Sequence, residues 1–359
     1  MRKYYIDNIR WVTVVLVVIY HVIYMFNGVL TAGVSGPFQA VQYQDAVQYI
    51  LYPWFMVLLF ILSGMCSRYY LDQHSSREFV RARTDKLLVP STIGLFAFQW
   101  LQGYVNMRLS AAFEQMPAAL PGPVLYLIMA VSGTGVLWYI QMLWIFSLLL
   151  VLVRKAEKGR FAAFCSRQAY SPLFLAALGI AVWGAAQVLN TPIIAVYRFG
   201  IYGLVFFLGY YIFSLEKVTD TLASCGWLYG IAAVILGAVS TAVYFGQNYA
   251  ESPVVNSPLS AAYLWFACLA ILGLMKRYGS GTSPFASFMS RKSWGLYIFH
   301  YLPLSACGML LREHTSLPAV WIYLLTGAAA FAGALVLYEI ISRIPVLRWC
   351  VLGIRRQTR

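Results

Sequence analysis

The chain has 359 residues, of which 61% are hydrophobic and only 11% are charged. Soluble domains carry about one quarter charged residues, so this composition excludes a soluble fold. A net charge of +14 would suit nucleic acid if it were spread evenly, but it is concentrated on one side of the predicted membrane topology. The sequence therefore predicts a polytopic membrane protein without a nucleic-acid partner.

Apolar runs of spanning length recur along the whole chain. Ten transmembrane helices are predicted, near residues 9–29, 48–68, 88–108, 136–153, 171–189, 197–214, 226–245, 258–275, 293–312 and 319–341. An even number of spans places both termini on the same side. The predicted fold class is an all-α membrane domain of about ten helices with both termini cytoplasmic.

Basic residues identify the cytoplasmic side. Every Lys and Arg lies on the predicted inner side except Arg108, Arg198 and Arg312. This asymmetry follows the positive-inside rule, and it favours anionic lipids and phosphorylated cytosolic ligands as partners. Residues 109–135 interrupt the pattern, because their apolar run from Val124 to Val131 is too short to span. We expect a re-entrant or interfacial piece there.

One membrane domain accounts for most of the chain. We predict a transmembrane domain over residues 1–345 and a short basic cytoplasmic tail over 346–359. No low-complexity linker or internal repeat is evident. The six cysteines have neither Cys-x-x-Cys nor Cys/His spacing, so no metal site and no disulfide are predicted.

The first predicted helix carries the most informative polar residues. Arg10 and His21 are eleven positions apart, about three helical turns, so their side chains share one face. The rise between them is about 16 Å, which puts His21 near the middle of a ~30 Å hydrocarbon layer. An ionisable group at that depth is costly and marks a functional site by default. The alternative is a structural hydrogen bond between helices.

Asp7 and Arg10 lie at the predicted cytoplasmic mouth of this helix. Asp7 is fourteen residues before His21 and nearly on the same face. Its alternative role is to cap the helix N-terminus. Arg10 is either an interfacial cation or a guanidinium fork that holds a phosphate or orders a catalytic base.

A basic cluster precedes the third predicted helix. Arg81, Arg83 and Lys86 lie in the cytoplasmic segment before it, and Arg83 and Lys86 are three residues apart on one helix face. Arg68 lies on the same side, at the end of the second helix. Such residues either set the topology and contact lipid or bind the phosphates of a cytosolic ligand. The sequence leaves both roles open.

A second histidine occupies the ninth predicted helix. His300 lies about seven residues from the inner boundary, roughly 10–12 Å deep, which is not far from the inferred depth of His21. Two intramembrane histidines that enter from the same side favour a shared polar pocket.

These motifs, taken in order, resemble the acyltransferase 3 family of bacterial membrane proteins, nearest the branch that contains periplasmic-glucan succinyltransferases. The resemblance is carried by Asp7-Asn8, Arg10-x10-His21, Phe60-Ile-Leu-Ser63-Gly64, Arg83-x-x-Lys86-Leu-Leu-Val-Pro90, Leu137-Trp138-Tyr139, Phe206-Phe207-Leu208-Gly209, Ser293-x-Gly295-x-Tyr297-x-x-His300, Tyr338-Glu339-Ile340 and Arg343-Ile344-Pro345. Lys86 stands where many members have a second arginine. The resemblance spans nearly the whole chain.

The resemblance implies an O-acyltransferase of the bacterial cytoplasmic membrane. Its donor would be cytosolic acyl-CoA, most often acetyl-CoA, with succinyl transfer also open. Its acceptor would be a hydroxyl of a carbohydrate or a lipid-linked molecule of the cell envelope. No permanently bound cofactor is expected.

For that reaction we hypothesise the following roles for the residues named above. His21 would act as general base, and Asp7 and Arg10 would orient the site or meet the donor. His300 would be a second-choice base or a hydrogen-bond partner for the acceptor. The nucleotide phosphates would be received by Arg83 and Lys86, with Arg81 and Arg68 as further candidates.

The rival function is a proton-coupled transporter of a small polar solute or of acylated product, because buried histidines also suit proton transport. The lack of an internal repeat and of paired interrupted helices disfavours it. A non-catalytic scaffold is least favoured, because it gives no role to two intramembrane histidines.

Overall fold

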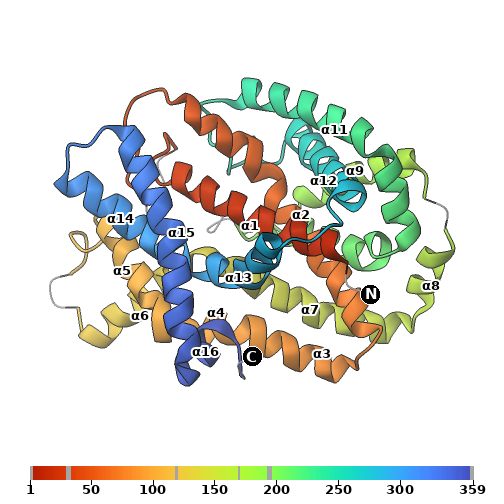
Figure 1. Ribbon diagram of the computed structural model, residues 1–359, viewed down its shortest axis with the longest axis horizontal. Coiled ribbons are helices and arrows are strands. Elements are labelled where there is room, and N and C mark those ends of the chain that lie inside the picture. Colours follow the sequence, from red (N-terminus) through yellow and green to blue (C-terminus); the bar gives the residue numbers. More distant parts are fainter. Residues whose placement is uncertain (1–2, 30–33, 118–119, 169, 192–195, 356–359) are drawn as a thin grey trace. The chain divides into compact units, whose positions relative to one another are not determined.

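The computed structural model describes residues 3–29, 34–117, 120–168, 170–191 and 196–355 (Figure 1). These residues are helical and include no β-strand, only one isolated bridge between Asn190 and Arg198. The predicted all-α fold class is therefore confirmed. Close contacts divide the chain into unit 1, which comprises Met1–Thr13, Gln48–Val80 and Ile145–Arg291, and unit 2, which comprises Val14–Val47, Arg81–Trp144 and Lys292–Arg359.

Five helices contribute residues to both units, namely α1 (Tyr4–Tyr24), α2 (Ala46–Leu71), α3 (Ser76–Arg83), α7 (Trp138–Glu157) and α13 (Pro284–Phe299). The others in unit 1 are α8 (Arg160–Arg167), α9 (Pro172–Ala186), α10 (Phe199–Leu208), η5 (Gly209–Phe213), α11 (Glu216–Tyr244) and α12 (Pro258–Tyr278). α9 and α12 begin in the same way, with a serine N-cap and proline at the first position. These residues satisfy or remove N–H groups that would otherwise lack a partner in lipid.

Glycines bring α2 and the α10–η5 segment into close contact within unit 1. A Cβ atom on Gly64 would lie 2.0 Å from the carbonyl oxygen of Phe206, and one on Gly209 would lie 2.2 Å from that of Ile61. Gly64, in the Ser63-Gly64 motif, thus permits a close approach of the two helical segments. Two of the sequence motifs therefore pack on each other.

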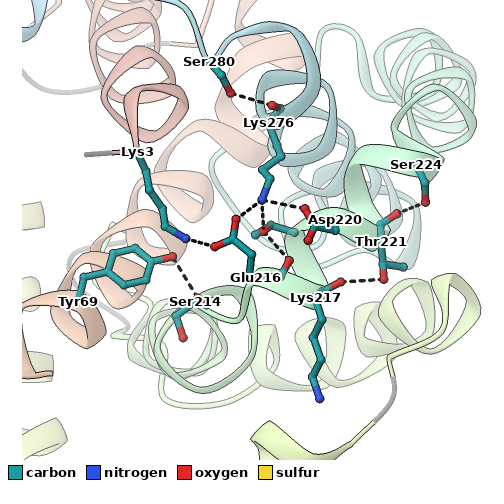
Figure 2. A network of polar contacts seen from close by, with 11 residues as sticks. Lys3, Tyr69, Ser214, Glu216, Lys217, Asp220, Thr221, Ser224, Lys276 and Ser280 are labelled. Atoms are coloured by element: carbon teal, nitrogen blue, oxygen red, sulfur yellow. Dashed lines mark hydrogen bonds and ion pairs between the residues drawn. The ribbon is translucent and has the colours of Figure 1, made fainter. Parts of the chain in front are cut away.

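An ionic network holds the start of the chain against α11 and α12 in unit 1 (Figure 2). The Lys3 ammonium lies 2.5 Å from one oxygen of Glu216, and the Lys276 ammonium lies 2.6 Å from the other. Lys276 also pairs with Asp220 at 2.9 Å. Nearby, the Tyr69 hydroxyl donates to the carbonyl oxygen of Ser214. These contacts fix the first turn of α1.

Unit 2 also holds the remaining helical elements. They are η1 (Tyr43–Asp45), η2 (Thr84–Leu88), α4 (Val89–Gly94), η3 (Leu95–Gln99), α5 (Trp100–Leu109), α6 (Gly122–Ser132), η4 (Gly135–Leu137), α14 (Tyr301–His314), α15 (Ala319–Arg343) and α16 (Pro345–Leu352). From Ser76 to Leu109 the chain is helical throughout, and η2 and η3 are two π-helical stretches within that run.

The short helix α6 packs on α5 through two glycines (Figure 1). A Cβ atom on Gly103 would lie 1.7 Å from the carbonyl oxygen of Met129, and one on Gly133 would lie 1.9 Å from that of Gln99. The eleven residues of α6 rise about 16 Å, half the thickness of the hydrocarbon layer. This helix is the apolar part of the segment for which the sequence predicts a re-entrant or interfacial piece.

The end of the chain folds back onto the start of the helical run that contains Lys86. α16 packs against α4, and a Cβ atom on Gly94 would lie 2.9 Å from the Cys350 carbonyl oxygen. Gly353 follows with φ +64, and a side chain there would meet the Asp85 carbonyl oxygen at 2.1 Å. Arg355 pairs with Asp85 at 2.6 Å. Of the predicted tail 346–359, residues 356–359 lie outside the described residues.

The predicted spans correspond to helices of several kinds. Among the described residues, six helical segments are long and apolar enough to cross a membrane, and they match the predicted spans 9–29, 48–68, 136–153, 226–245, 258–275 and 319–341. α9 and the run Phe199–Phe213 are apolar but shorter. The protein is a multi-pass membrane protein, and the number of ten spans stays a prediction.

One predicted span is bent. Where the sequence predicts a single helix over 293–312, α13 and α14 meet at His300 with an angle of 55°. The bend has an identifiable cause, because Pro303 lacks the N–H that would donate to the Phe299 carbonyl. The nitrogen Nδ1 of His300 also lies at the carbonyl oxygens of the last turn of α13.

Candidate active site

His21 and His300 lie side by side in unit 2. His21 is on α1, and His300 is at the junction of α13 and α14. The distance between His21 Nδ1 and His300 Nε2 is 3.1 Å. His300 is fully buried, whereas His21 is half-buried. The structure thus brings together the two histidines that the sequence singles out.

The neighbouring carbonyls define which ring nitrogens carry protons. His300 Nδ1 lies 3.0 Å from the Leu296 oxygen and 2.9 Å from the Tyr297 oxygen. Carbonyl oxygens only accept, so we assign the proton of His300 to Nδ1 and a lone pair to its Nε2.

The same reasoning applies to His21. Its Nδ1 lies 2.8 Å from the Val17 oxygen and therefore carries a proton, which it shares between that oxygen and the lone pair of His300 Nε2. In the neutral ring, Nε2 of His21 is then unprotonated, and none of the hydrogen bonds among the described residues uses it. A half-buried imidazole with a free lone pair is suited to accept a proton from a substrate.

Aromatic rings surround His21. The ring centroids of Tyr20 and Tyr301 lie 5.0 and 5.1 Å from that of His21, both edge-on, and Tyr24 lies 6.3 Å away. These rings restrict the orientation of the imidazole. They were not singled out from the sequence, although Tyr24 is three residues from His21 and shares its face, and Tyr301 directly follows His300.

The predicted mouth residues of α1 lie in unit 1. The Arg10 guanidinium contacts Asp7 at 3.4 Å and donates to the Cys66 sulfur at 3.1 Å. Next to them is a cavity of about 380 Å³ lined by Lys3, Ile6, Asp7, Cys66, Tyr69, Asp72 and Gln73. Asp7 therefore faces open space, and Arg10 orders two of the residues that line it.

Arg68 lines a second cavity in unit 1, called the Arg154 cavity below. It measures about 440 Å³ and is lined by Arg68, Asp72, Arg154, Glu157, Lys158, Gly159, Ala162, Ala163, Ser166 and Tyr210. Both of its carboxylates are already engaged. Asp72 pairs with Arg68 at 3.0 Å, and Glu157 accepts from the Phe161 amide at the start of α8. Neither Arg154 nor Lys158 makes an ion pair among the described residues.

Sequence reasoning missed Arg154 and Lys158 as partners of Arg68. Arg154 lies in the last turn of α7, whereas Lys158 directly follows that helix with a positive φ, so their spacing is not that of two residues on one helix face. No sequence pattern connects the end of α7 with the end of α2, so their association needed the structure.

Lys86 lies in what we call the Lys86 cluster, formed with Trp294 and Leu352 in unit 2. The ammonium is 4.3 Å from the centroid of the Trp294 ring and 3.4 Å from the Leu352 carbonyl oxygen. The Trp294 indole donates to the same oxygen at 3.1 Å. Burial lowers the pKa of Lys86 from its ordinary 10.5 to about 7, so Lys86 titrates near neutral pH.

The other predicted phosphate ligands differ in exposure. Arg83 is half-buried beside the Lys86 cluster on the same helical run, whereas Arg81 is exposed. Of the predicted site residues, His21, His300, Arg81, Arg83 and Lys86 thus belong to unit 2, and Asp7, Arg10 and Arg68 belong to unit 1.

The comparisons with known proteins agree with the motifs. A family model described as an acyltransferase domain of the acyltransferase 3 type matches residues 3–339. No curated protein and no solved structure matches the chain. The match covers nearly the whole chain, including both histidines and the basic residues named above. The chain therefore belongs to the acyltransferase 3 family and is a membrane acyltransferase.

Proposed function

We propose that the protein transfers an acyl group, acetyl or succinyl, from cytosolic acyl-CoA to a hydroxyl of a carbohydrate or lipid-linked acceptor of the cell envelope. The family supports acyl transfer in general. One observation carries the finer assignment: the His21–His300 contact leaves Nε2 of His21 unprotonated on the half-buried ring.

In the proposed reaction His21 is the general base. Its Nε2 removes the proton of the acceptor hydroxyl while the oxygen attacks the thioester carbonyl. The intermediate then collapses with cleavage of the carbon–sulfur bond, and the coenzyme A thiolate takes the proton from His21. A positioned base contributes about 10²–10⁴ in rate. The products are an ester and free coenzyme A.

His300 is a positioning residue in this scheme. Its Nε2 accepts the Nδ1 proton of His21 and its own Nδ1 is held by two carbonyls, so the pair keeps His21 in one tautomer. The role resembles that of the third group of a nucleophile–base–orienter arrangement. In this scheme His300 is not an alternative base, because the lone pair on its Nε2 points at His21.

The donor's phosphates would bind to cationic groups on the cytosolic side. The half-buried Arg83 and the Lys86 cluster are candidates in unit 2, and Arg68, Arg154 and Lys158 are candidates in unit 1. Arginine forks and a lysine point charge both suit phosphate oxygens. Asp7 and Arg10 order the neighbouring cavity.

The direct test measures acceptor-dependent release of free coenzyme A by purified protein from radiolabelled acetyl-CoA and succinyl-CoA, with envelope material as the acceptor. His21→Ala should abolish release while size-exclusion behaviour stays unchanged. Full activity of folded His21→Ala protein would disprove the base assignment. Movement of a labelled solute into vesicles without thioester cleavage would identify a transporter instead.

The phosphate role of the basic cluster needs a binding measurement. Changing both Arg83 and Lys86 to Gln should weaken acetyl-CoA affinity, because two cationic contacts are lost. An unchanged affinity would show that these residues only set the topology.

A further inference from the structure

Arg198 is a buried cation at the end of α10 that the charge pattern places outside. Only 4% of its surface is exposed. The other two outer arginines have evident partners. Arg108 pairs with Glu313 at 3.5 Å, and Arg312 donates to two backbone carbonyls at 2.8 Å each. Arg198 differs from both.

The guanidinium of Arg198 is incompletely satisfied. One terminal nitrogen donates to the Asn256 side-chain oxygen at 2.8 Å and lies 3.5 Å from the Val255 carbonyl oxygen, and the side chain also contacts the Tyr202 hydroxyl. The Nε atom is enclosed and has no hydrogen-bond partner. No carboxylate among the described residues pairs with Arg198, so its charge is uncompensated. A buried unpaired charge is strongly unfavourable.

A small cavity adjoins this group. It measures about 10 Å³, which is room for about one water-sized group. Two buried serines, Ser240 and Ser260, line it together with Arg198. No hydrogen bond among the described residues uses either serine hydroxyl. The rest of the lining is aromatic or apolar and consists of Tyr49, Pro53, Tyr244, Tyr249, Val254, Val255 and Leu264.

We propose that this cavity binds one small anion, the size of chloride or of a single carboxylate group. Arg198 supplies the counter-charge, and the hydroxyls of Ser240 and Ser260 donate to the anion. Three observations within unit 1 support the site: the uncompensated charge, the orphaned Nε atom, and hydroxyl donors around a small enclosed space next to the guanidinium. The anion would tie α10 to α11 and α12, which carry the two serines.

The test uses thermal unfolding of the purified protein in detergent and does not depend on acyl transfer. Protein in sodium gluconate is titrated with sodium chloride, and separately with sodium formate, at constant ionic strength. Gluconate is too large for the cavity. Binding to the folded state alone raises the unfolding temperature in a saturable way. We expect a saturable rise of several degrees for the wild type, and a flat titration with both salts would overturn the proposal.

Two variants make the result specific. Arg198→Gln should lose the anion response, while the control Arg312→Gln should keep it, because the Arg312 guanidinium is already held by carbonyls. A response of Arg198→Gln equal to that of the wild type would overturn the proposal.

Ser240→Asp covers the case in which Arg198→Gln does not fold. It places a carboxylate in the cavity, so the variant should be as stable in gluconate as the wild type is in chloride, and should no longer respond. A Ser240→Asp protein that still responds fully would overturn the site. A response to chloride alone identifies an inorganic ion as the occupant. A stronger response to formate identifies the carboxylate of an organic ligand.

Discussion

His300 Nε2 lies 3.1 Å from His21 Nδ1, and for two neutral rings the surrounding backbone carbonyls leave only one arrangement of protons that makes every contact a hydrogen bond. The buried His300 therefore orients the half-buried His21 by accepting its Nδ1 proton. Each helix contributes one imidazole, and the bend between α13 and α14 lies at the residue that completes the pair.

Removing His300 should lower kcat more than it changes KM, because His300 orients the base without touching the donor. We expect His300→Ala to lose less activity than His21→Ala. The double variant should be no worse than His21→Ala alone, since residues that act as a unit are not additive. Steady-state kinetics with acetyl-CoA check this, with His314→Ala, an exposed histidine, as control. Additive losses would contradict a shared role.

Donor binding should depend on the protonation of Lys86. Its pKa of about 7 means that the ammonium is charged below neutral pH and neutral above it. Acetyl-CoA affinity should therefore fall as the pH rises through about 7, by about tenfold for one charge-assisted contact. Lys86→Arg stays charged and should flatten the profile. Isothermal titration from pH 6 to 8.5 would measure it, and the same slope in Lys86→Arg would exclude Lys86.

The same shift in the pKa of Lys86 predicts the direction in which the free energy of unfolding changes with pH. The unfolded chain has the ordinary lysine value of 10.5, and the folded protein has about 7. Between these values the unfolded chain binds more protons, so the free energy of unfolding should rise with pH across that window. Lys86→Met should reduce this slope, as thermal unfolding at several pH values would show.

The Arg154 cavity can be tested against the Lys86 cluster as a phosphate site. Changing both Arg154 and Lys158 to Gln removes the two cations that lack an anionic partner among the described residues there. If the cavity receives donor phosphates, acetyl-CoA affinity should drop about tenfold or more. Lys155→Gln is a matched control, because Lys155 lies on the same helix turn and does not line the cavity. Equal affinities of the wild type and the double variant would rule the cavity out.

The glycine contact between α5 and α6 should be intolerant of a side chain. Gly103→Ala would place a methyl group 1.7 Å from the Met129 carbonyl oxygen, and overpacking of this kind costs about 1–3 kcal/mol. Gly122→Ala is the matched control in α6, because a Cβ atom there would meet nothing within 4 Å. Thermal unfolding in detergent should separate the two variants. Equal stability of the two would show that the helices do not pack as described.

The network at Glu216 should contribute modestly and in a salt-dependent way. Glu216 pairs with Lys3 and Lys276, but 63% of its side chain is exposed. Exposed pairs contribute about 0.2–1 kcal/mol each and are screened by salt. Glu216→Gln should therefore lower the unfolding temperature at low ionic strength and have little effect at high ionic strength. Glu251→Gln removes an exposed charge that makes no described ion pair. This control should leave the unfolding temperature unchanged at low and at high ionic strength.

Most of the fold could be predicted from the sequence, because a segment that crosses lipid must satisfy its backbone hydrogen bonds internally and is therefore helical. The length of an apolar run predicts a spanning helix, and the asymmetry of the basic residues predicts its orientation. The bend at His300 was not predicted, because apolar periodicity continues across it and only Pro303 hints at a break. The π-helical stretches between Ser76 and Leu109 were also missed, since local sequence carries no clear signal for them.

The candidate site was only partly accessible from sequence. Spacing and depth single out His21 and His300, because ionisable groups are rare in such segments. Their direct contact was not predictable, since the relative rotation of two helices depends on packing. Trp294 and Leu352 around Lys86 were missed for the same reason. No rule of spacing connects residue 86 with residue 352.

The Lys86 cluster has a consequence for biosynthesis. Two of its three members, Trp294 and Leu352, lie more than 200 residues after Lys86 in the chain. Gly353 packs directly against the Asp85 backbone. A nascent chain emerges from its N-terminus onward, so Lys86 is translated more than 200 residues before its partners Trp294 and Leu352. A protein shortened before α16 would insert most of its helices and still lack this cluster. Completion of the Lys86 cluster is therefore coupled to the synthesis of α16.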